Sequence, residues 1–169
     1  MPKVRGGAMR VLAIDPGPEL SAWVLWDGET IGGMNISNNQ ELINNPYLWD
    51  LKTCGADVLV VEKIMSYGMT VSTLIFDTVF WTGRFCQAWG GEFFRVPRME
   101  VKMHFCHNSR AKDSNIRQAI LDRFEPDLKP RQRPKGILKG VSRDIWAALA
   151  VAIYWIDLHG EVKEGSHEI

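Results

Sequence analysis

The hydrophobic positions of this chain fall into short apolar runs that alternate with longer segments of helical period. Two runs of β-branched and aliphatic residues predict buried strands, at 11–15 (VLAID) and 57–62 (DVLVVE), and 93–96 (FFRV) predicts a short strand that ends at Pro97. Between the first two, residues 21–37 predict a hairpin, because two strand-like runs flank Asp27-Gly28, a favoured two-residue turn. The pattern therefore predicts three consecutive antiparallel strands and then two more strands.

Helical periods occupy most of the remaining chain. One helix is expected at 38–54, with an interruption at Pro46. A second is expected at 70–89, because apolar residues recur there at helical spacing: Leu74, Ile75, Val79, Phe80 and Phe85.

Three helices are expected to complete the chain. Two basic helices follow at 98–106 and 114–124, and a last helix of about four turns carries Asp144 in its first turn. Ser114 and Ser142 are expected to cap the helices next to them. The order βββαβαβααα predicts an α/β domain around a five-stranded mixed sheet, three strands antiparallel and then parallel ones, flanked by helices.

Length and composition fit one domain. The chain has 169 residues, of which 46% are hydrophobic and 24% charged, enough for a continuous core. We expect a flexible leader at 1–8, with Met9 as an alternative start, a domain at 9–160 and a C-terminal tail at 161–169. No apolar stretch approaches a membrane span, and no signal peptide is visible, so neither membrane insertion nor secretion is expected.

The cysteines favour a cytoplasmic location. Cys54, Cys86 and Cys106 are odd in number, lie in apolar or helical segments and lack paired metal-ligand spacing. We expect buried thiols of a reducing compartment and no zinc site.

Charge is unevenly distributed along the chain. The whole sequence is neutral, yet residues 95–143 hold 13 Lys and Arg against 5 Asp and Glu. A strongly basic third in a neutral protein favours a polyanionic partner, most often nucleic acid. The plainer interpretation is a solvated helical surface.

Three carboxylates stand at the ends of apolar runs. Asp15 closes the first strand, Glu62 closes the fourth, and Asp144 opens the last helix. Acids at the carboxyl ends of strands lie at the rim of a sheet, where open α/β folds place ligand crevices, and acids gathered there normally share divalent cations. Each acid alone also fits a solvated strand end or, for Asp144, a favourable helix N-terminus.

Taken in order, these motifs resemble the RuvC family of Holliday-junction resolvases, and the phage-encoded branch looks closest. The resemblance is carried by VLAIDPG, by the acid after VLVV, by the basic helix pair containing VK and AK, and by D-x-W-x-ALAVA in the last helix. It spans roughly residues 9–158. The ordered set carries the specificity, because D-P-G after a strand also occurs in sugar kinases and actin-like ATPases.

The resemblance implies a ribonuclease H-like fold and a metal-dependent endonuclease that nicks branched DNA. By position, Asp15, Glu62 and Asp144 match the family's catalytic, metal-binding acids, with Asp15 bridging two ions. Mg²⁺ is the expected cofactor, with Mn²⁺ able to substitute, because carboxylates suit hard cations that activate water and neutralise a leaving oxygen. Lys102 and Lys112 match basic residues near the scissile phosphate, and Lys112 is the expected catalytic helper. A phage-encoded protein would act in the host cytoplasm.

Two departures from the family pattern are visible. Bacterial members carry a second acid three residues into the last helix, where this chain has Ala147. Either three carboxylates suffice, or this chain binds one metal weakly, or it is an inactivated variant, and the sequence leaves these alternatives open. In the loop after Asp15 the usual small glycine is Ala22, preceded by Ser21, which a requirement for a small side chain tolerates.

Ten basic residues are expected to contact DNA phosphates without reading sequence. The group at 129–143 is the most exposed and concentrated, and solvation alone is the alternative for each residue. The ten are Arg98, Lys102, Arg110, Lys112, Arg117, Arg131, Arg133, Lys135, Lys139 and Arg143.

Apolar residues indicate two further contacts. In the loop after Glu62, Met65 and Tyr67 are expected to wedge against unpaired bases, the alternative being that they cover the edge of the core. In helix 70–89, Phe76, Phe80 and Trp81 give more apolar surface than one buried face needs. Family members dimerise through this helix, so a two-fold homodimer is expected, with core packing as the alternative.

The sequence thus predicts a homodimeric, magnesium-dependent, structure-selective endonuclease for branched DNA, with no membrane partner. Ala147 motivates a rival, a catalytically silent module that binds DNA junctions. The D-P-G turn motivates an actin-like or sugar-kinase phosphotransferase. That class is disfavoured, because it needs two such domains and a second phosphate-binding glycine loop.

Overall fold

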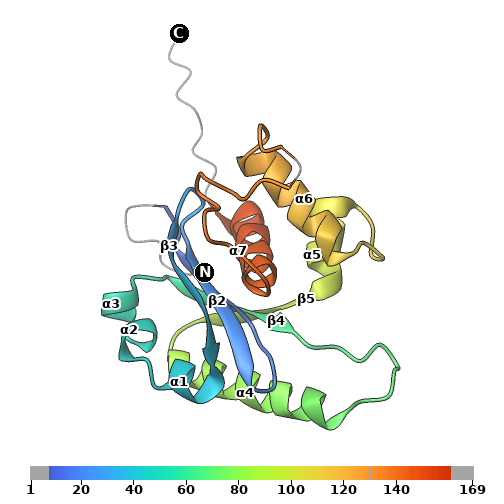
Figure 1. The fold of residues 1–169 in the computed structure, drawn as a ribbon. Coiled ribbons are helices and arrows are strands. Elements are labelled where there is room, and N and C mark those ends of the chain that lie inside the picture. Colours follow the sequence, from blue (N-terminus) through green and yellow to red (C-terminus); the bar gives the residue numbers. More distant parts are fainter. Residues whose placement is uncertain (1–7, 130, 161–169) are drawn as a thin grey trace.

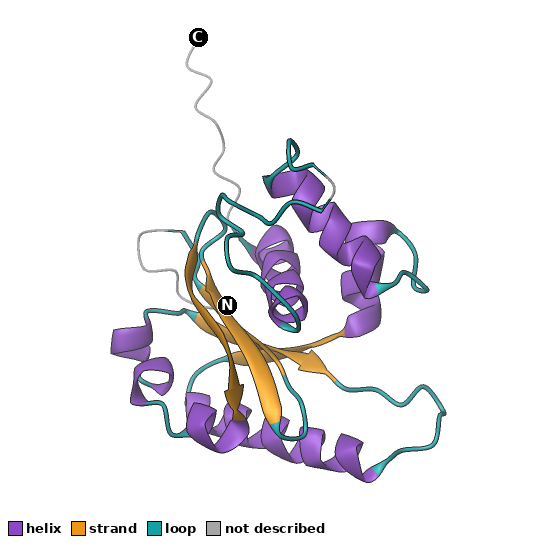
Figure 2. Cartoon of the chain, in the orientation of Figure 1, coloured by secondary structure: helices purple, strands orange, loops and turns teal. Residues whose placement is uncertain are grey.

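The computed structural model describes residues 8–129 and 131–160, which form one sheet between two layers of helices (Figures 1 and 2). β2 pairs antiparallel with β1 and β3, whereas β4 runs parallel to β1 and to β5. The predicted mixed sheet is confirmed. Its order is β3-β2-β1-β4-β5, and the strands are β1 (Val11–Asp15), β2 (Leu20–Trp26), β3 (Ile31–Asn38), β4 (Val58–Lys63) and β5 (Phe93–Pro97).

The helices divide between the two faces of the sheet (Figure 1). The first four lie against one face and the last three cover the other. They are α1 (Asn39–Ile43), α2 (Pro46–Trp49), α3 (Leu51–Cys54), α4 (Thr73–Trp89), α5 (Arg98–Cys106), α6 (Asp113–Phe124) and α7 (Ile145–His159).

The alternation of strand residues builds a core on each face. Residues 11, 13, 58 and 60 pack towards α7, and residues 12, 14, 59 and 61 pack towards α4. Ala148, Leu149 and Ala152 of α7 are fully buried, and the small alanine side chains let the helix pack closely against the sheet. The strands β1 and β4 are therefore held rigidly at the centre of the molecule.

The segment expected to be helical at 38–54 with an interruption at Pro46 has that interruption, but a second break at Asp50 was not expected, so the segment forms three short helices. Pro46 has no N–H to continue a helix and instead begins α2. The side chain of Asn45 accepts a hydrogen bond from the N–H of Tyr47 (3.0 Å), and that of Asp50 accepts one from the N–H of Lys52 (2.9 Å). Two new helix starts are thereby capped within one expected helix.

The two-residue turn at Asp27-Gly28 is also wrong, because residues 27–30 all belong to the connection between β2 and β3. The carboxylate of Asp27 accepts hydrogen bonds from the N–H groups of Glu29 (2.9 Å) and Thr30 (2.7 Å). An aspartate that bonds the backbone two and three residues on stabilises this wider turn.

Both expected serine caps are corrected. Ser114 lies inside α6, whose N-cap is Lys112, and the N–H of Lys112 donates to Oδ1 of Asn115 (2.9 Å). Asp144, expected in the first turn of α7, is itself the N-cap residue, and Ser142 precedes it.

The helix expected at 70–89 is confirmed as α4, but of the five apolar residues that predicted it only Phe85 is buried. Leu74, Val79 and Phe80 are exposed, while the buried side is made by Thr78, Thr82, Phe85, Cys86 and Trp89. Thr78 and Thr82 can face the core because each hydroxyl donates to the carbonyl four residues earlier, at 2.8 and 2.9 Å.

The expectation of buried thiols is confirmed for Cys54 and Cys86, whereas Cys106 is half-buried. All three cysteines are free thiols. No helix in 8–129 or 131–160 has the length and apolar character needed to cross a membrane. The expected tail and all of the expected leader except Ala8 lie outside the described residues.

Candidate active site

The parallel register of β1 and β4 sets two of the predicted acids side by side. Ala13 pairs with Val60 and Ile14 with Val61, so the next residues along the two strands are Asp15 and Glu62. Alternation places both acids on the face that packs against α7. Glu62 is only 6% exposed, which excludes a solvated strand end for this residue.

The third acid reaches the same place from the start of α7. Asp15, Glu62 and Asp144 line one cleft of about 100 Å³, together with a fourth carboxylate from the start of α6, Asp113. Ala147 also lines this cleft, so an acid at its position would have faced the same space.

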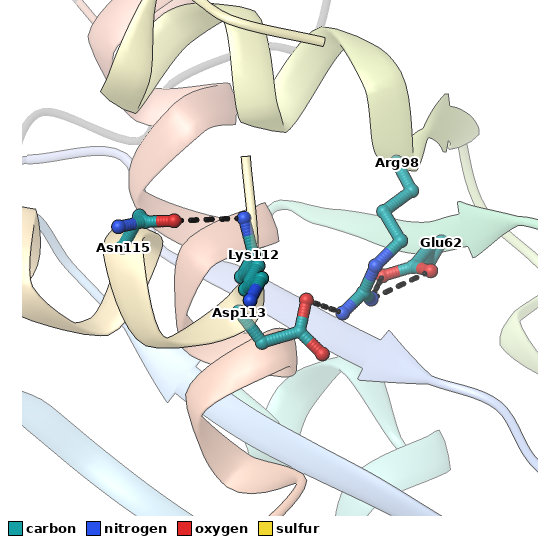
Figure 3. A network of polar contacts seen from close by, with 5 residues as sticks. All are labelled: Glu62, Arg98, Lys112, Asp113 and Asn115. Atoms are coloured by element: carbon teal, nitrogen blue, oxygen red, sulfur yellow. Dashed lines mark hydrogen bonds and ion pairs between the residues drawn. The ribbon is translucent and has the colours of Figure 1, made fainter. Parts of the chain in front are cut away.

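An arginine at the start of α5 joins two of these carboxylates (Figure 3). Nη1 of Arg98 donates to Oε1 (3.1 Å) and Oε2 (2.9 Å) of Glu62, and Nη2 donates to Oδ1 of Asp113 (2.5 Å). Arg98 was expected to contact a DNA phosphate. Its guanidinium lies in the cleft, where it neutralises part of the acidic charge.

Burial and mutual repulsion disfavour ionisation of the acids. Burial, and then the neighbouring charge of Glu62, raise the pKa of Asp15 to about 8, against the partial compensation of Arg98. Burial also raises the pKa of Glu62, although its contact with Arg98 opposes this. A cation near Asp15 would stabilise the ionised forms of both acids and so lower the pKa of each.

The donor chemistry of the cleft fits a divalent cation such as Mg²⁺. Carboxylate oxygens are the hard ligands that such ions prefer, and in the described part of the chain no hydrogen bond or ion pair engages the carboxylates of Asp15 and Asp144. The acidic side chains lie some way apart from one another, however. Within residues 8–129 and 131–160, no three His, Cys, Asp or Glu side chains are close enough to hold one ion together. A bound cation would therefore draw the acids inward.

The loop after Asp15 is fixed by a small buried polar cluster. The Ser21 hydroxyl accepts from the N–H of Gly17 (3.2 Å) and donates to Oδ1 of Asn39 (2.6 Å), whose amide donates to the Gly17 carbonyl (2.9 Å). Gly17 is required here, because a Cβ atom would collide with the Leu20 carbonyl oxygen. Ser21 thus has a structural role beside the strand that carries Asp15.

A basic groove continues from the acidic cleft. Arg117, Arg143 and Trp146 line the cleft and also a neighbouring groove of about 720 Å³, which adds Arg133 and Lys139. The guanidinium of Arg117 lies over the ring of Trp146, 5.0 Å from its centroid. Four of the ten predicted phosphate contacts therefore line the groove, and a fifth, Arg98, lies in the adjoining cleft.

The other predicted basic residues lie around this surface or on its loops. Lys102 is half-buried in α5, and Lys112 and Arg110 are exposed at and before the start of α6. Arg131 and Lys135 are exposed on the loop between α6 and α7. Lys112 does not line the acidic cleft itself, although it adjoins Asp113 (Figure 3).

The loop between β4 and α4 begins directly after Glu62 and Lys63 and reaches out beyond the sheet (Figure 1). Met65 and Tyr67 are 41% and 55% exposed, and Tyr67 has a positive φ of 46°. Neither side chain is buried against the edge of the core.

Two residues with clear roles in this region escaped the sequence analysis. Asp113 lies just before the helix expected at 114–124 and ends no apolar run, and only the packing of α6 against α5 brings it to Arg98. The carboxylate of Glu125 accepts hydrogen bonds from the N–H groups of Lys135 (3.0 Å), Gly136 (3.1 Å) and Leu138 (3.2 Å), and so fixes the basic loop.

Comparison with solved structures identifies the fold. Thermus thermophilus RuvC has a TM-score of 0.62 at 18% identity, covering 86% of this chain and 92% of that one. The same protein in complex with a Holliday junction substrate has a TM-score of 0.62 at 17% identity, with coverage of 86% and 92%. The yeast mitochondrial Holliday junction resolvase Ydc2 has a TM-score of 0.51 at 10% identity, covering 89% and 80%.

The fold is thus the ribonuclease H-like fold of RuvC, as the sequence resemblance implied. No family model matches the sequence, and neither does any curated protein.

Proposed function

We propose that this protein is a structure-selective endonuclease that nicks branched DNA, including four-way junctions, by metal-dependent hydrolysis of a phosphodiester. One observation carries the proposal: Asp15, Glu62 and Asp144, far apart in the sequence, line a single cleft that opens into a basic groove. The shared fold supports it, since T. thermophilus RuvC has been solved with a Holliday junction substrate.

The groove offers a path for a DNA strand to the acids. A phosphodiester backbone could follow the groove to the acidic cleft. Its negative phosphates would be neutralised on the way by the basic side chains of Arg133, Lys139, Arg143 and Arg117. The exposed loop with Met65 and Tyr67 begins at the same end of β4 and would meet bases where the strands of a junction separate.

The residues of the cleft divide the chemical work. Asp15 and Asp144, whose oxygens are not engaged by hydrogen bonds within the described chain, would hold a divalent cation, Mg²⁺ or Mn²⁺. Such a cation lowers the pKa of bound water and neutralises charge on the phosphate. As water adds to phosphorus, the bond to the leaving nucleotide oxygen breaks, and that oxygen takes up a proton in exchange for the one that water loses. Lys112, exposed beside the cleft, would approach the phosphate from there.

A homodimer through α4 belongs to the same proposal. Phe76, Val79 and Phe80 are each at least half exposed on the side of this helix that faces away from the sheet, and Leu74 in its first turn is exposed as well. This α4 face is large and apolar for a surface that meets only water. A two-fold dimer would present two acidic clefts to the two symmetric strands of a junction. Acting on cellular DNA, the protein would work in the cytoplasm.

The direct test measures nicking of a labelled four-way junction. With Mg²⁺ we expect one nick per strand near the branch, and none with EDTA. Replacing Asp15→Asn should lower the rate at least about a hundredfold while preserving junction affinity, because it removes a cation ligand without touching the basic groove. Asp127→Asn, an acid-to-amide change on the exposed loop, is the matched control and should retain the rate.

The alternatives give different results. Tight junction binding without a nick at any metal concentration would identify a silent binding module. Full activity of Asp15→Asn would contradict the assignment of the metal ligands. Hydrolysis of ATP by a protein that does not bind DNA would point to a phosphotransferase.

A further inference from the structure

We propose that Arg98 is a built-in cation that takes the place of the second divalent ion, so that the acidic cleft holds one metal ion per chain. This inference rests on the proposed nuclease function and specifies how its site is charged.

The position of the guanidinium is the first argument. One nitrogen of Arg98 contacts both oxygens of Glu62, and the other terminal nitrogen contacts Asp113. Glu62 is therefore already satisfied by a cation, whereas no such partner of Asp15 or Asp144 occurs among the described residues. A charge-assisted pair of this geometry, two-thirds shielded from solvent on the arginine side, is stronger than an exposed one.

The charge of the cleft is the second argument. Four carboxylates and three guanidinium groups line it, which leaves one net negative charge when all four acids are ionised, the state that cation binding requires. One divalent cation converts this to a single positive charge, which matches the single negative charge of a phosphodiester. Two divalent cations would leave an excess of three positive charges in a space of about 100 Å³.

Ala147 is the third argument. It lines the cleft without contributing a carboxylate, so the charge that would balance a second metal is missing. The loss of an acid and the presence of an internal cation act in the same direction. Arg98 then neutralises negative charge on the Glu62 side of the phosphate, while the single ion serves the side of Asp15 and Asp144.

The test counts bound metal ions without relying on activity. Mn²⁺ is titrated into the full-length chain, and free Mn²⁺ is measured by electron paramagnetic resonance. We expect one bound ion in the wild type and in Arg98→Lys, which keeps the charge. Two are expected in Arg98→Met and Arg98→Gln, with the second binding at least tenfold more tightly than any second site of the wild type. Arg95→Met, the same change at an exposed position of β5, should bind one.

Each other outcome has a definite meaning. Two ions in the wild type would overturn the role of Arg98 and leave the nuclease proposal standing. One ion in folded Arg98→Met or Arg98→Gln, as judged by circular dichroism, would overturn it too. The Gln variant retains a hydrogen-bond donor for Glu62 and keeps the test informative if the Met variant misfolds. Failure of the wild type to bind Mn²⁺ at all would instead contradict the proposed function.

Discussion

At the scale of single residues, the position of Asp15 depends on the loop that follows it. The chain turns sharply after β1, and the backbone of Gly17 comes so close to the Leu20 carbonyl that no side chain fits. Ser21 and Asn39 then hold both polar groups of Gly17. The acid is thus fixed from one side by strand pairing and from the other by this loop.

Gly17→Ala should therefore destabilise the protein by about 1–3 kcal/mol, the usual cost of forcing an added methyl group into a closely packed site. The measurement is urea unfolding followed by circular dichroism. Gly83→Ala is the matched control, since a Cβ there meets nothing within 4 Å and alanine favours a helix over glycine. The control should gain up to about 1 kcal/mol. Equal stability of Gly17→Ala and the wild type would contradict the close approach.

The acids of β1 and β4 could be predicted from the sequence, because each ends an apolar run and the order of elements makes the two strands parallel neighbours. The arginine contact could not. Arg98 is one of 13 basic residues in its region, and its pairing with Glu62 depends on where β5 ends and on how α6 packs against α5. Ion pairs between distant elements leave no periodic signal in a sequence.

At the scale of elements, the loop between α6 and α7 is held in shape despite its proline, glycine and basic content. Glu125 at the end of α6 accepts three backbone N–H groups of the loop, and Leu138 within it is fully buried. Composition predicted an exposed loop, which is correct for its basic side chains. The fixed backbone depends on one carboxylate that composition does not distinguish from its neighbours.

This arrangement predicts that Glu125→Ala weakens binding to a four-way junction by about three- to tenfold, since basic side chains on a loosened loop lose entropy on binding. Electrostatics alone predicts the opposite sign, because the change removes a negative charge from a basic surface. Asp127→Ala is the control, as it removes the same charge from an exposed neighbour and should bind equally or slightly more tightly. Fluorescence anisotropy at fixed salt measures both. Tighter binding by Glu125→Ala would refute the positioning role.

Helix α4 shows the limit of periodicity. Its apolar residues recur at helical spacing, yet two threonines and a cysteine occupy much of the buried side while Phe76 and Phe80 face outwards. Threonine hydroxyls that are hydrogen-bonded within the helix can be buried at little cost in free energy. The more apolar face of α4, with Phe76 and Phe80, is therefore not needed for the core. A periodic pattern locates a helix but does not tell which face meets the core when both faces carry apolar residues.

At the scale of the whole molecule, the α4 face lies on the side of the sheet opposite α7 (Figure 1). Pairing through it would leave the cleft between β1, β4 and α7 uncovered in both copies. Next to the face lies a hollow of about 410 Å³ between α4 and the ends of β4 and β5, lined by Val79, Cys86 and Phe93 among others. An apolar side chain of a second copy would fill such a hollow better than water.

Phe76→Lys should therefore convert the proposed dimer to a monomer at micromolar concentration. Burial of a phenylalanine contributes about 1.5–3 kcal/mol, and a two-fold interface loses this contribution twice, which weakens association by more than about a hundredfold. Sedimentation equilibrium distinguishes a 19.2 kDa chain from its dimer. Leu158→Lys is the control, since Leu158 is comparably exposed on α7, away from the α4 face. A monomeric wild type, or a Phe76→Lys variant that associates as tightly as the wild type, would exclude pairing through α4. A monomeric variant that still nicks should cut the two strands of a junction independently, because its two clefts would no longer be joined.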